Sequence, residues 1–234
     1  MPAEIAAQPE ETQKPALIAP VWHTILVVLF FLAPISLKRF MPRIVPADMP
    51  LIYLAWLQVQ WIAFMAVVAG LAFRKTKVTD LIGVRWRSKQ DFFRDFALGV
   101  GFSLIDLLIV SALYFLFGPS YKTRGSLLPQ DLVQLLAFLP VAVSAGITEE
   151  LIFRGYLLRQ FHAISGRIST AIVLQAALFS LAHGYNQSAV GMIEKFWYGL
   201  LIALFARWRK SLLPGILSHS WQDSAAGILA FLLG

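Results

Sequence analysis

Residues 131–160 read DLVQLLAFLPVAVSAGITEELIFRGYLLRQ. The run starts apolar and becomes polar in its second half, which contains Glu149, Glu150 and Arg154. Crossing about 30 Å of hydrocarbon takes roughly 20 predominantly apolar residues in a helix. The segment therefore predicts a membrane-spanning helix that carries charged side chains at membrane depth.

Further apolar runs lie on both sides of this segment, and the composition of the whole chain agrees with a membrane protein. Of the 234 residues, 58% are hydrophobic and 14% are charged, whereas a soluble domain averages about 45–50% and roughly 25%. The pattern predicts an all-α fold, a polytopic transmembrane helical bundle of about seven spans. Their approximate bounds are Val21–Leu37, Leu51–Phe73, Phe96–Phe117, Asp131–Gln160, Ile168–Gly184, Ser188–Ala206 and Leu212–Leu233.

The same pattern divides the chain into three regions. Residues 1–20 are expected to form a disordered cytoplasmic tail, because their polar start lacks the basic n-region of a signal peptide. Residues 21–91 are expected to hold a transmembrane hairpin and a basic amphipathic segment, about Lys77–Phe93, that lies on the membrane surface. Residues 92–234 are expected to form the membrane domain that carries the polar motifs.

Basic residues decide the expected orientation of the chain. It has 20 lysines and arginines and a net charge of +7. With the N-terminus in the cytoplasm, most of them fall in cytoplasmic segments, as the positive-inside rule requires. The outside loops then hold Lys38, Arg39, Arg43, Lys122 and Arg124. We expect a multi-pass protein of the cell membrane whose partners include membrane lipid and no nucleic acid.

Ionisable side chains in the fourth predicted span mark a candidate site, because each costs about 2.5–3.5 kcal/mol at the centre of a spanning helix. Glu150 and Arg154 are four residues apart, so they share a helix face and can pair. Glu149 is turned by about 100° from that face. An unpaired carboxylate in this position is a candidate general base that takes a proton from water. The alternative is that these charges are purely structural.

Two other predicted spans carry histidines. His183 ends the fifth span, and His219 shares a face of the seventh with Asp223. Such groups can instead hydrogen bond between helices and hold a bundle together. Polar clusters on three separate spans favour hydrolysis, which needs a carboxylate base, an imidazole and donors for an oxyanion. The pattern assigns no role to Asp106, Glu194 or Lys195.

Three motifs in this order resemble those of the CPBP family, which comprises type II CAAX prenyl proteases and bacteriocin-processing (Abi) proteins: Glu149-Glu150-x-x-x-Arg154, Phe179-x-x-x-His183 and His219-x-x-x-Asp223. The resemblance extends over about Phe92–Leu233. The family has Asn or Asp at the last motif position, and its prenyl endopeptidases have Asn where this chain has Asp223.

The resemblance implies roles for the candidate residues. Glu149 and His183 would position and activate water. His219 and Asp223 would shape the oxyanion site. Glu150 and Arg154 would support Glu149. The implied activity is an intramembrane endopeptidase, of glutamic or metallo type, acting on a membrane-associated protein or peptide.

A cofactor and two other functions stay open at this point. Zinc could be bound by His183, His219 and one carboxylate, although the chain has no His-Glu-x-x-His pairing. The absence of cysteine excludes a thiolate metal site. The alternative functions are a non-catalytic membrane immunity or scaffold protein and a proton-coupled transporter. The lack of an internal repeat argues against the transporter.

Overall fold

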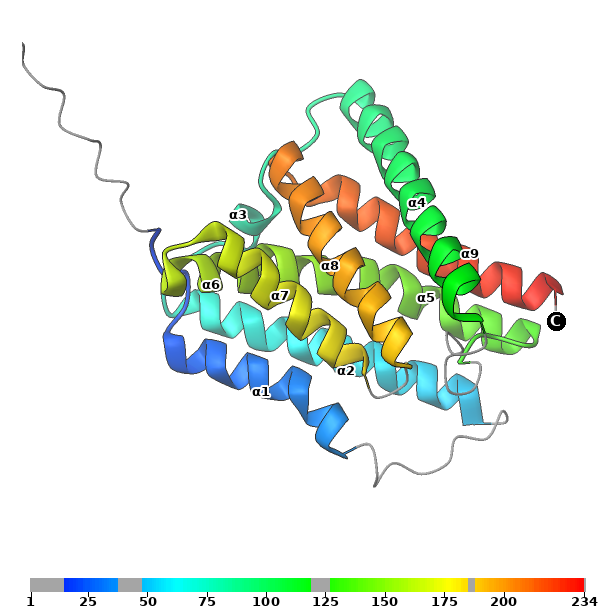
Figure 1. Cartoon of the computed structure of the whole chain (residues 1–234). Coiled ribbons are helices and arrows are strands. Elements are labelled where there is room, and N and C mark those ends of the chain that lie inside the picture. The colour runs from blue at the N-terminus through cyan, green and yellow to red at the C-terminus, as the bar shows by residue number, and fades with distance from the viewer. Residues whose placement is uncertain (1–14, 38–47, 119–126, 185–187, 234) are drawn as a thin grey trace, which may run out of the picture.

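The computed structural model describes residues 15–37, 48–118, 127–184 and 188–233, and these fold into helices (Figure 1). The predicted all-α bundle is confirmed. Residues 1–14 of the predicted tail and the five basic residues of the predicted outside loops lie outside the described residues. The elements are α1 (Val21–Leu37), α2 (Met49–Ala72), α3 (Val78–Ile82), α4 (Lys89–Phe117), α5 (Leu132–Glu149), η4 (Glu150–Leu157), α6 (Leu158–Ser165), α7 (Ile168–His183), α8 (Ala189–Arg209) and α9 (Leu213–Leu233).

Four helical runs in the described part of the chain are long and apolar enough to cross a membrane: α2, α4, α8 and the continuous run Leu132–Ser165 formed by α5, η4 and α6. Two apolar helices are shorter, Val21–Ala33 and Ile168–His183. Helix α9 has 21 residues, but its polar run from His219 to Asp223 lowers its mean hydropathy. Each predicted span thus corresponds to a helical run, and the chain is a multi-pass membrane protein.

The run formed by α5, η4 and α6 lies in the middle of the bundle (Figure 1). Helix α5 packs against both α2 and α9, and α7 packs against α6 and α8. The large side chains of Phe153, Tyr156 and Phe179 are at most 1% exposed between these helices. Polar groups of the central run are therefore shielded from lipid, where they would otherwise be unpaired at high cost.

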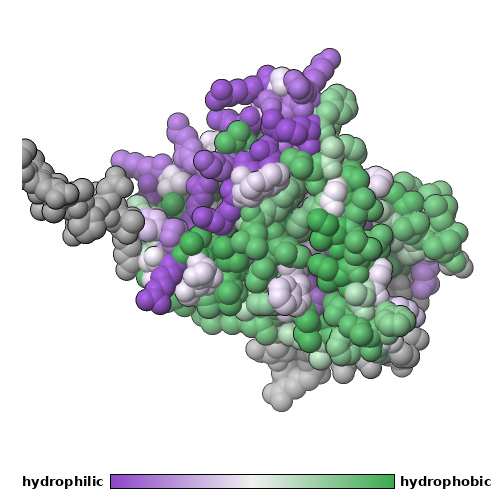
Figure 2. All heavy atoms as spheres, turned by 45° about the horizontal axis from the view of Figure 1, so that its top comes forward, coloured by the Kyte–Doolittle hydropathy of each residue, from purple (hydrophilic) through white to green (hydrophobic). Residues whose placement is uncertain are grey.

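The basic segment predicted at Lys77–Phe93 folds as the short helix α3, a loop and the beginning of α4. The loop is fixed to the turn between α8 and α9. Gly83 and Ser211 form an isolated β-bridge. Gly83 has a φ of +78°, and a Cβ there would meet the backbone carbonyl of Lys210, so glycine is favoured. Figure 2 shows hydrophilic side chains gathered over this end of the molecule, where α3, the start of α4 and the end of α8 lie.

Asp95 joins the helices at the same end. Asp95 is 2% exposed, and its carboxylate accepts hydrogen bonds from Trp86 Nε1 at 3.0 Å and from the Arg209 guanidinium. Buried carboxylates require such partners. Asp95 lies in α4, so the bond from Trp86 holds the preceding loop against α4, and the bond from Arg209 fixes the end of α8 to α4.

The end of the region predicted as a disordered tail is instead held against α6. The backbone N–H groups of Ile18 and Ala19 donate to Gln160 Oε1 at 2.9 and 3.3 Å. Gln160 Nε2 donates to the carbonyl of Ala19 at 3.0 Å, and Ala19 is fully buried. The ordered bundle therefore begins before α1.

Candidate active site

Glu149 and Glu150 lie where helix α5 changes its winding. Element η4 is a π-helix, in which the N–H of Leu158 bonds to the carbonyl of Phe153, five residues earlier. Such segments are rare inside α-helices and are frequent at functional sites. All residues of η4 are buried. The polar half of the predicted fourth span thus contains a π-helical segment, which places Glu150 and Arg154 in the interior of the bundle.

Glu150 and Arg154 form the ion pair that their spacing predicts. Arg154 Nη1 lies 3.0 Å from Glu150 Oε1, and both side chains are 0% exposed. The guanidinium carbon also lies 4.4 Å from the centroid of the Phe179 ring, a cation–π contact. The pair therefore links the first motif to α7, the helix of the second motif.

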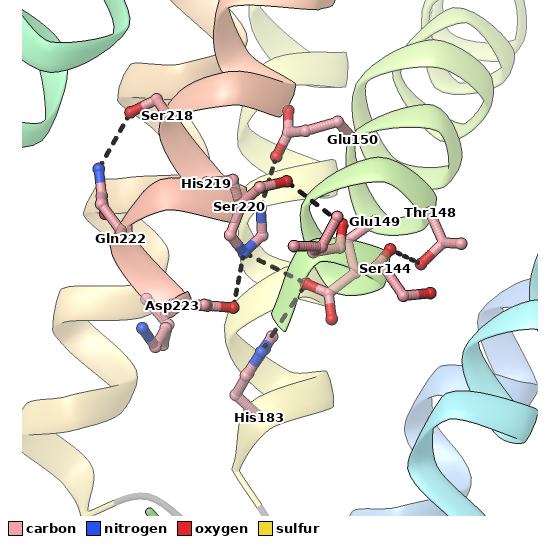
Figure 3. Close-up of polar contacts among 12 residues, drawn as sticks. Ser144, Thr148, Glu149, Glu150, His183, Ser218, His219, Ser220, Gln222 and Asp223 are labelled. Carbon is pink, nitrogen blue, oxygen red and sulfur yellow. Dashed lines mark hydrogen bonds and ion pairs between the residues drawn. The ribbon is translucent and has the colours of Figure 1, made fainter. Parts of the chain in front are cut away.

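Glu149 faces the histidines instead of the arginine. Its Oε2 lies 4.0 Å from His183 Nε2 and 3.9 Å from His219 Nε2 (Figure 3). The side chain is 18% exposed, and Oε2 is buried without a hydrogen-bond partner. Most buried polar atoms are hydrogen-bonded. Glu150 Oε2 is also buried without a partner, but the Glu150 side chain is 0% exposed and its other oxygen is paired with Arg154. Glu149 is thus the carboxylate of the motif that another polar molecule can reach.

His183 is oriented by its own helix. Its Nδ1 lies 2.8 Å from the carbonyl oxygen of Phe179, four residues earlier. Because a carbonyl only accepts, Nδ1 carries the hydrogen, and Nε2 of the neutral ring presents a lone pair. That lone pair faces Glu149 Oε2 at 4.0 Å. Two acceptors at this separation can share one water molecule, with each O–H···acceptor distance about 2.8 Å.

His219 connects the two glutamates with Asp223. Its Nδ1 lies 3.1 Å from Glu150 Oε1, and its Nε2 lies 3.6 Å from Asp223 Oδ2. The Asp223 side chain is 41% exposed, so the centre is closed behind Glu150 and open beside Asp223. The structure brings together all the predicted site residues: Glu149, Glu150, His183, His219 and Asp223 (Figure 3).

Helices α5 and α9 approach closely where Gly146 meets Ser220. A Cβ at position 146 would lie 2.5 Å from the backbone nitrogen of Ser220 and 2.9 Å from its Cα. Gly146 lies about one turn before Glu149, and Ser220 directly follows His219. This glycine contact therefore sets the distance between the first and third motifs.

We expect Gly146→Ala to lower the free energy of unfolding and to disturb the centre. The backbone of α9 cannot move aside as a flexible side chain would, so overpacking should cost about 1–3 kcal/mol. Thermal unfolding of the purified protein in detergent, followed by tryptophan fluorescence, measures the change.

Gly101→Ala is the matched control, because no atom lies within 4 Å of a Cβ at that position. Alanine is preferred over glycine within helices by roughly 0.5–1 kcal/mol, so this variant should be neutral or slightly stabilised. Equal unfolding temperatures for the two variants would contradict the close approach of α5 and α9.

The imidazoles and carboxylates are not arranged as a zinc site. Ligands bind one tetrahedral zinc at about 2.0–2.2 Å, which places them roughly 3.3 Å from each other. Glu149 Oε2 lies 3.9 and 4.0 Å from the two imidazole nitrogens. Among the residues that the structure describes, no group of three or more His, Cys, Asp or Glu could hold a metal ion. No step is therefore assigned to a metal.

Tyr198 borders the centre and was not found from the sequence motifs. Its ring centroid lies 5.4 Å from that of His219 and 5.9 Å from that of Phe179. Tyr198 follows Glu194 by four residues, so both lie on one face of α8. A carboxylate and a phenol at this spacing inside a span are the signal that could have identified it.

Residues 131–225, from the start of α5 into α9, match the family model of the type II CAAX prenyl endopeptidase Rce1-like proteins. Over this range the chain is similar to the CAAX protease family. The matched range contains all three motifs, so the predicted resemblance is confirmed, although the match begins at residue 131 and not near Phe92. No curated protein and no solved structure matches the chain. The match indicates a membrane protease as the general activity.

Proposed function

We propose that this protein is an intramembrane endopeptidase in which Glu149 activates the attacking water. The main support is the position of Glu149 Oε2, which is buried, has no hydrogen-bond partner and lies 3.9–4.0 Å from two imidazoles. A water molecule between Glu149 and His183 would be oriented by two acceptors. General base catalysis by such a carboxylate contributes about 10²–10⁴-fold to the rate.

In the proposed reaction, Glu149 takes a proton from this water while the water oxygen bonds to the carbonyl carbon of the peptide. The π electrons of the carbonyl move to its oxygen, which becomes an oxyanion. When the oxyanion collapses, the C–N bond breaks and Glu149 returns the proton to the departing amine. His183 holds the water through its Nε2 lone pair. Glu150, bonded to both Arg154 and His219, keeps the second imidazole in place.

The proposed substrate is a membrane-associated protein or peptide, because the centre lies inside an apolar bundle and opens beside Asp223. Asp223 replaces the asparagine of the prenyl endopeptidases, so we define the substrate by its membrane attachment and not by a prenyl group. The proposed location is the cell membrane with a cytoplasmic N-terminus. The hydrophilic end formed by α3, α4 and α8 would then face the cytoplasm (Figure 2).

We expect the purified protein in detergent to cleave a membrane-anchored peptide at a rate that a metal chelator does not change. The reason is that Glu149 and the two histidines can orient water without a metal. Mass spectrometry of the products identifies the hydrolysed bond. Activity that is lost to the chelator and restored by zinc would contradict the metal-free mechanism and would make these side chains metal ligands. No cleavage of any anchored peptide would contradict the proposed function.

A further inference from the structure

The Tyr198 hydroxyl is buried without a hydrogen-bond partner, and the residue is 4% exposed. Two other buried tyrosines differ from it. The Tyr53 hydroxyl donates to the carbonyl of Leu127 at 2.8 Å, and the Tyr156 hydroxyl lies 2.8 Å from His23 Nδ1. Buried phenols usually have such partners, because an unpaired buried hydroxyl is unfavourable. Tyr198 therefore carries a free hydrogen-bond donor in the interior of the bundle.

The Tyr198 ring that carries this hydroxyl lies beside the candidate active site. The Tyr198 ring meets the His219 ring edge-on at 5.4 Å, and it also packs against Phe179, whose carbonyl orients His183. The guanidinium carbon of Arg154 lies 5.9 Å from the centroid of the Tyr198 ring. The ring, on α8, therefore meets residues of η4, α7 and α9.

His219 offers an Nε2–H donor to an oxyanion only when its ring is protonated. Its Nδ1 contacts the Glu150 carboxylate that also accepts from Arg154, so Nδ1 carries a hydrogen. In the neutral ring, Nε2 is then an acceptor. In the protonated ring, Nε2–H faces the carboxylates of Asp223 and Glu149 at 3.6 and 3.9 Å. Fixed donors that stabilise the oxyanion usually make a large contribution to catalysis, so a neutral donor beside His219 would add to the site.

We propose that the Tyr198 hydroxyl donates a hydrogen bond to the oxyanion formed from the substrate carbonyl, which makes Tyr198 a further catalytic residue. This inference rests on the proposed endopeptidase function. The bond strengthens as the carbonyl oxygen gains the electron pair of the broken π bond, because hydrogen bonds to charged acceptors are stronger. The phenol keeps its proton throughout, so the proton balance of the reaction is unchanged. An interaction made chiefly in the transition state raises kcat.

The test is Tyr198→Phe, which removes the hydroxyl and keeps the ring. We expect kcat for the anchored peptide to fall about 100- to 1,000-fold with KM little changed, as for the loss of one oxyanion donor. The unfolding temperature should not fall, because no hydrogen bond is lost in the free protein. Tyr53→Phe is the matched control. It breaks the bond to Leu127 far from the centre, so it should lower the unfolding temperature and leave kcat unchanged.

Wild-type kcat in Tyr198→Phe would overturn this inference and leave the endopeptidase function standing. A wild-type protein that cleaves nothing would overturn both. If Tyr198→Phe does not fold, fluorinated tyrosines at position 198 provide the second measurement, because they keep the hydroxyl and change its acidity. A dependence of kcat on phenol acidity would support the donor role, and a flat response would overturn it.

Discussion

Glu149→Gln is expected to abolish peptide cleavage while the protein stays folded. Glutamine keeps the shape of the side chain, but its amide cannot take a proton from water. The rate should fall by at least the contribution of a general base, about 10²–10⁴-fold. Because Glu149 Oε2 has no hydrogen-bond partner, the substitution breaks no existing bond at this atom. Cleavage of an anchored peptide and thermal unfolding, measured on the same preparation, separate the two effects.

Asp80→Asn serves as the control for this experiment. Asp80 lies in α3 and accepts a hydrogen bond from the backbone of Lys77 at an exposed site, so this carboxylate is remote from the reaction. The control variant should cleave at the wild-type rate. Retained cleavage by Glu149→Gln would exclude Glu149 as the base, whatever the behaviour of the control.

Arg154→Ala is expected to have the largest effect on stability. Both partners of the Glu150–Arg154 pair are 0% exposed, so the substitution leaves a buried carboxylate with only His219 beside it. Removing one partner of a buried ion pair typically costs about 3–5 kcal/mol. The substitution also removes the cation–π contact with Phe179. We expect little folded protein in membranes, measured as the monodisperse yield after detergent extraction and as the unfolding temperature.

Two further variants provide the comparison for Arg154→Ala. Arg94 is 50% exposed and pairs with Asp91 at 3.0 Å, and a surface pair of this kind is worth about 0–1 kcal/mol. Its Nε also lies 3.4 Å from Asp95, which keeps its bonds to Trp86 and Arg209 when Arg94 is replaced. Arg94→Ala should therefore be close to wild type. Adding Glu150→Gln to Arg154→Ala should restore part of the stability, because the buried charge is then gone. Arg154→Ala protein as stable as Arg94→Ala would show that the buried pair is not structural.

Local sequence spacing was enough to predict the spans and the pair within the first motif. Glu150 and Arg154 are four residues apart, and their contact depends only on the helix that contains both. The same reasoning predicted that Glu149 does not contact Arg154. In the structure, Arg154 pairs with Glu150, and Glu149 faces the histidines. The π-helical winding of η4 was not predictable in this way, because it depends on how the neighbouring helices hold the segment.

Hydropathy and residue type were sufficient to predict a helical membrane protein and the side chains that are chemically capable of hydrolysis. Contacts between side chains of different helices became known only from the fold. The bond from His219 to Glu150, the approach of Gly146 to Ser220 and the position of Tyr198 all cross between helices. Such contacts cannot be predicted from spacing, because helical periodicity specifies only the face of a helix on which a residue lies. The packing of that face against other helices specifies what it meets.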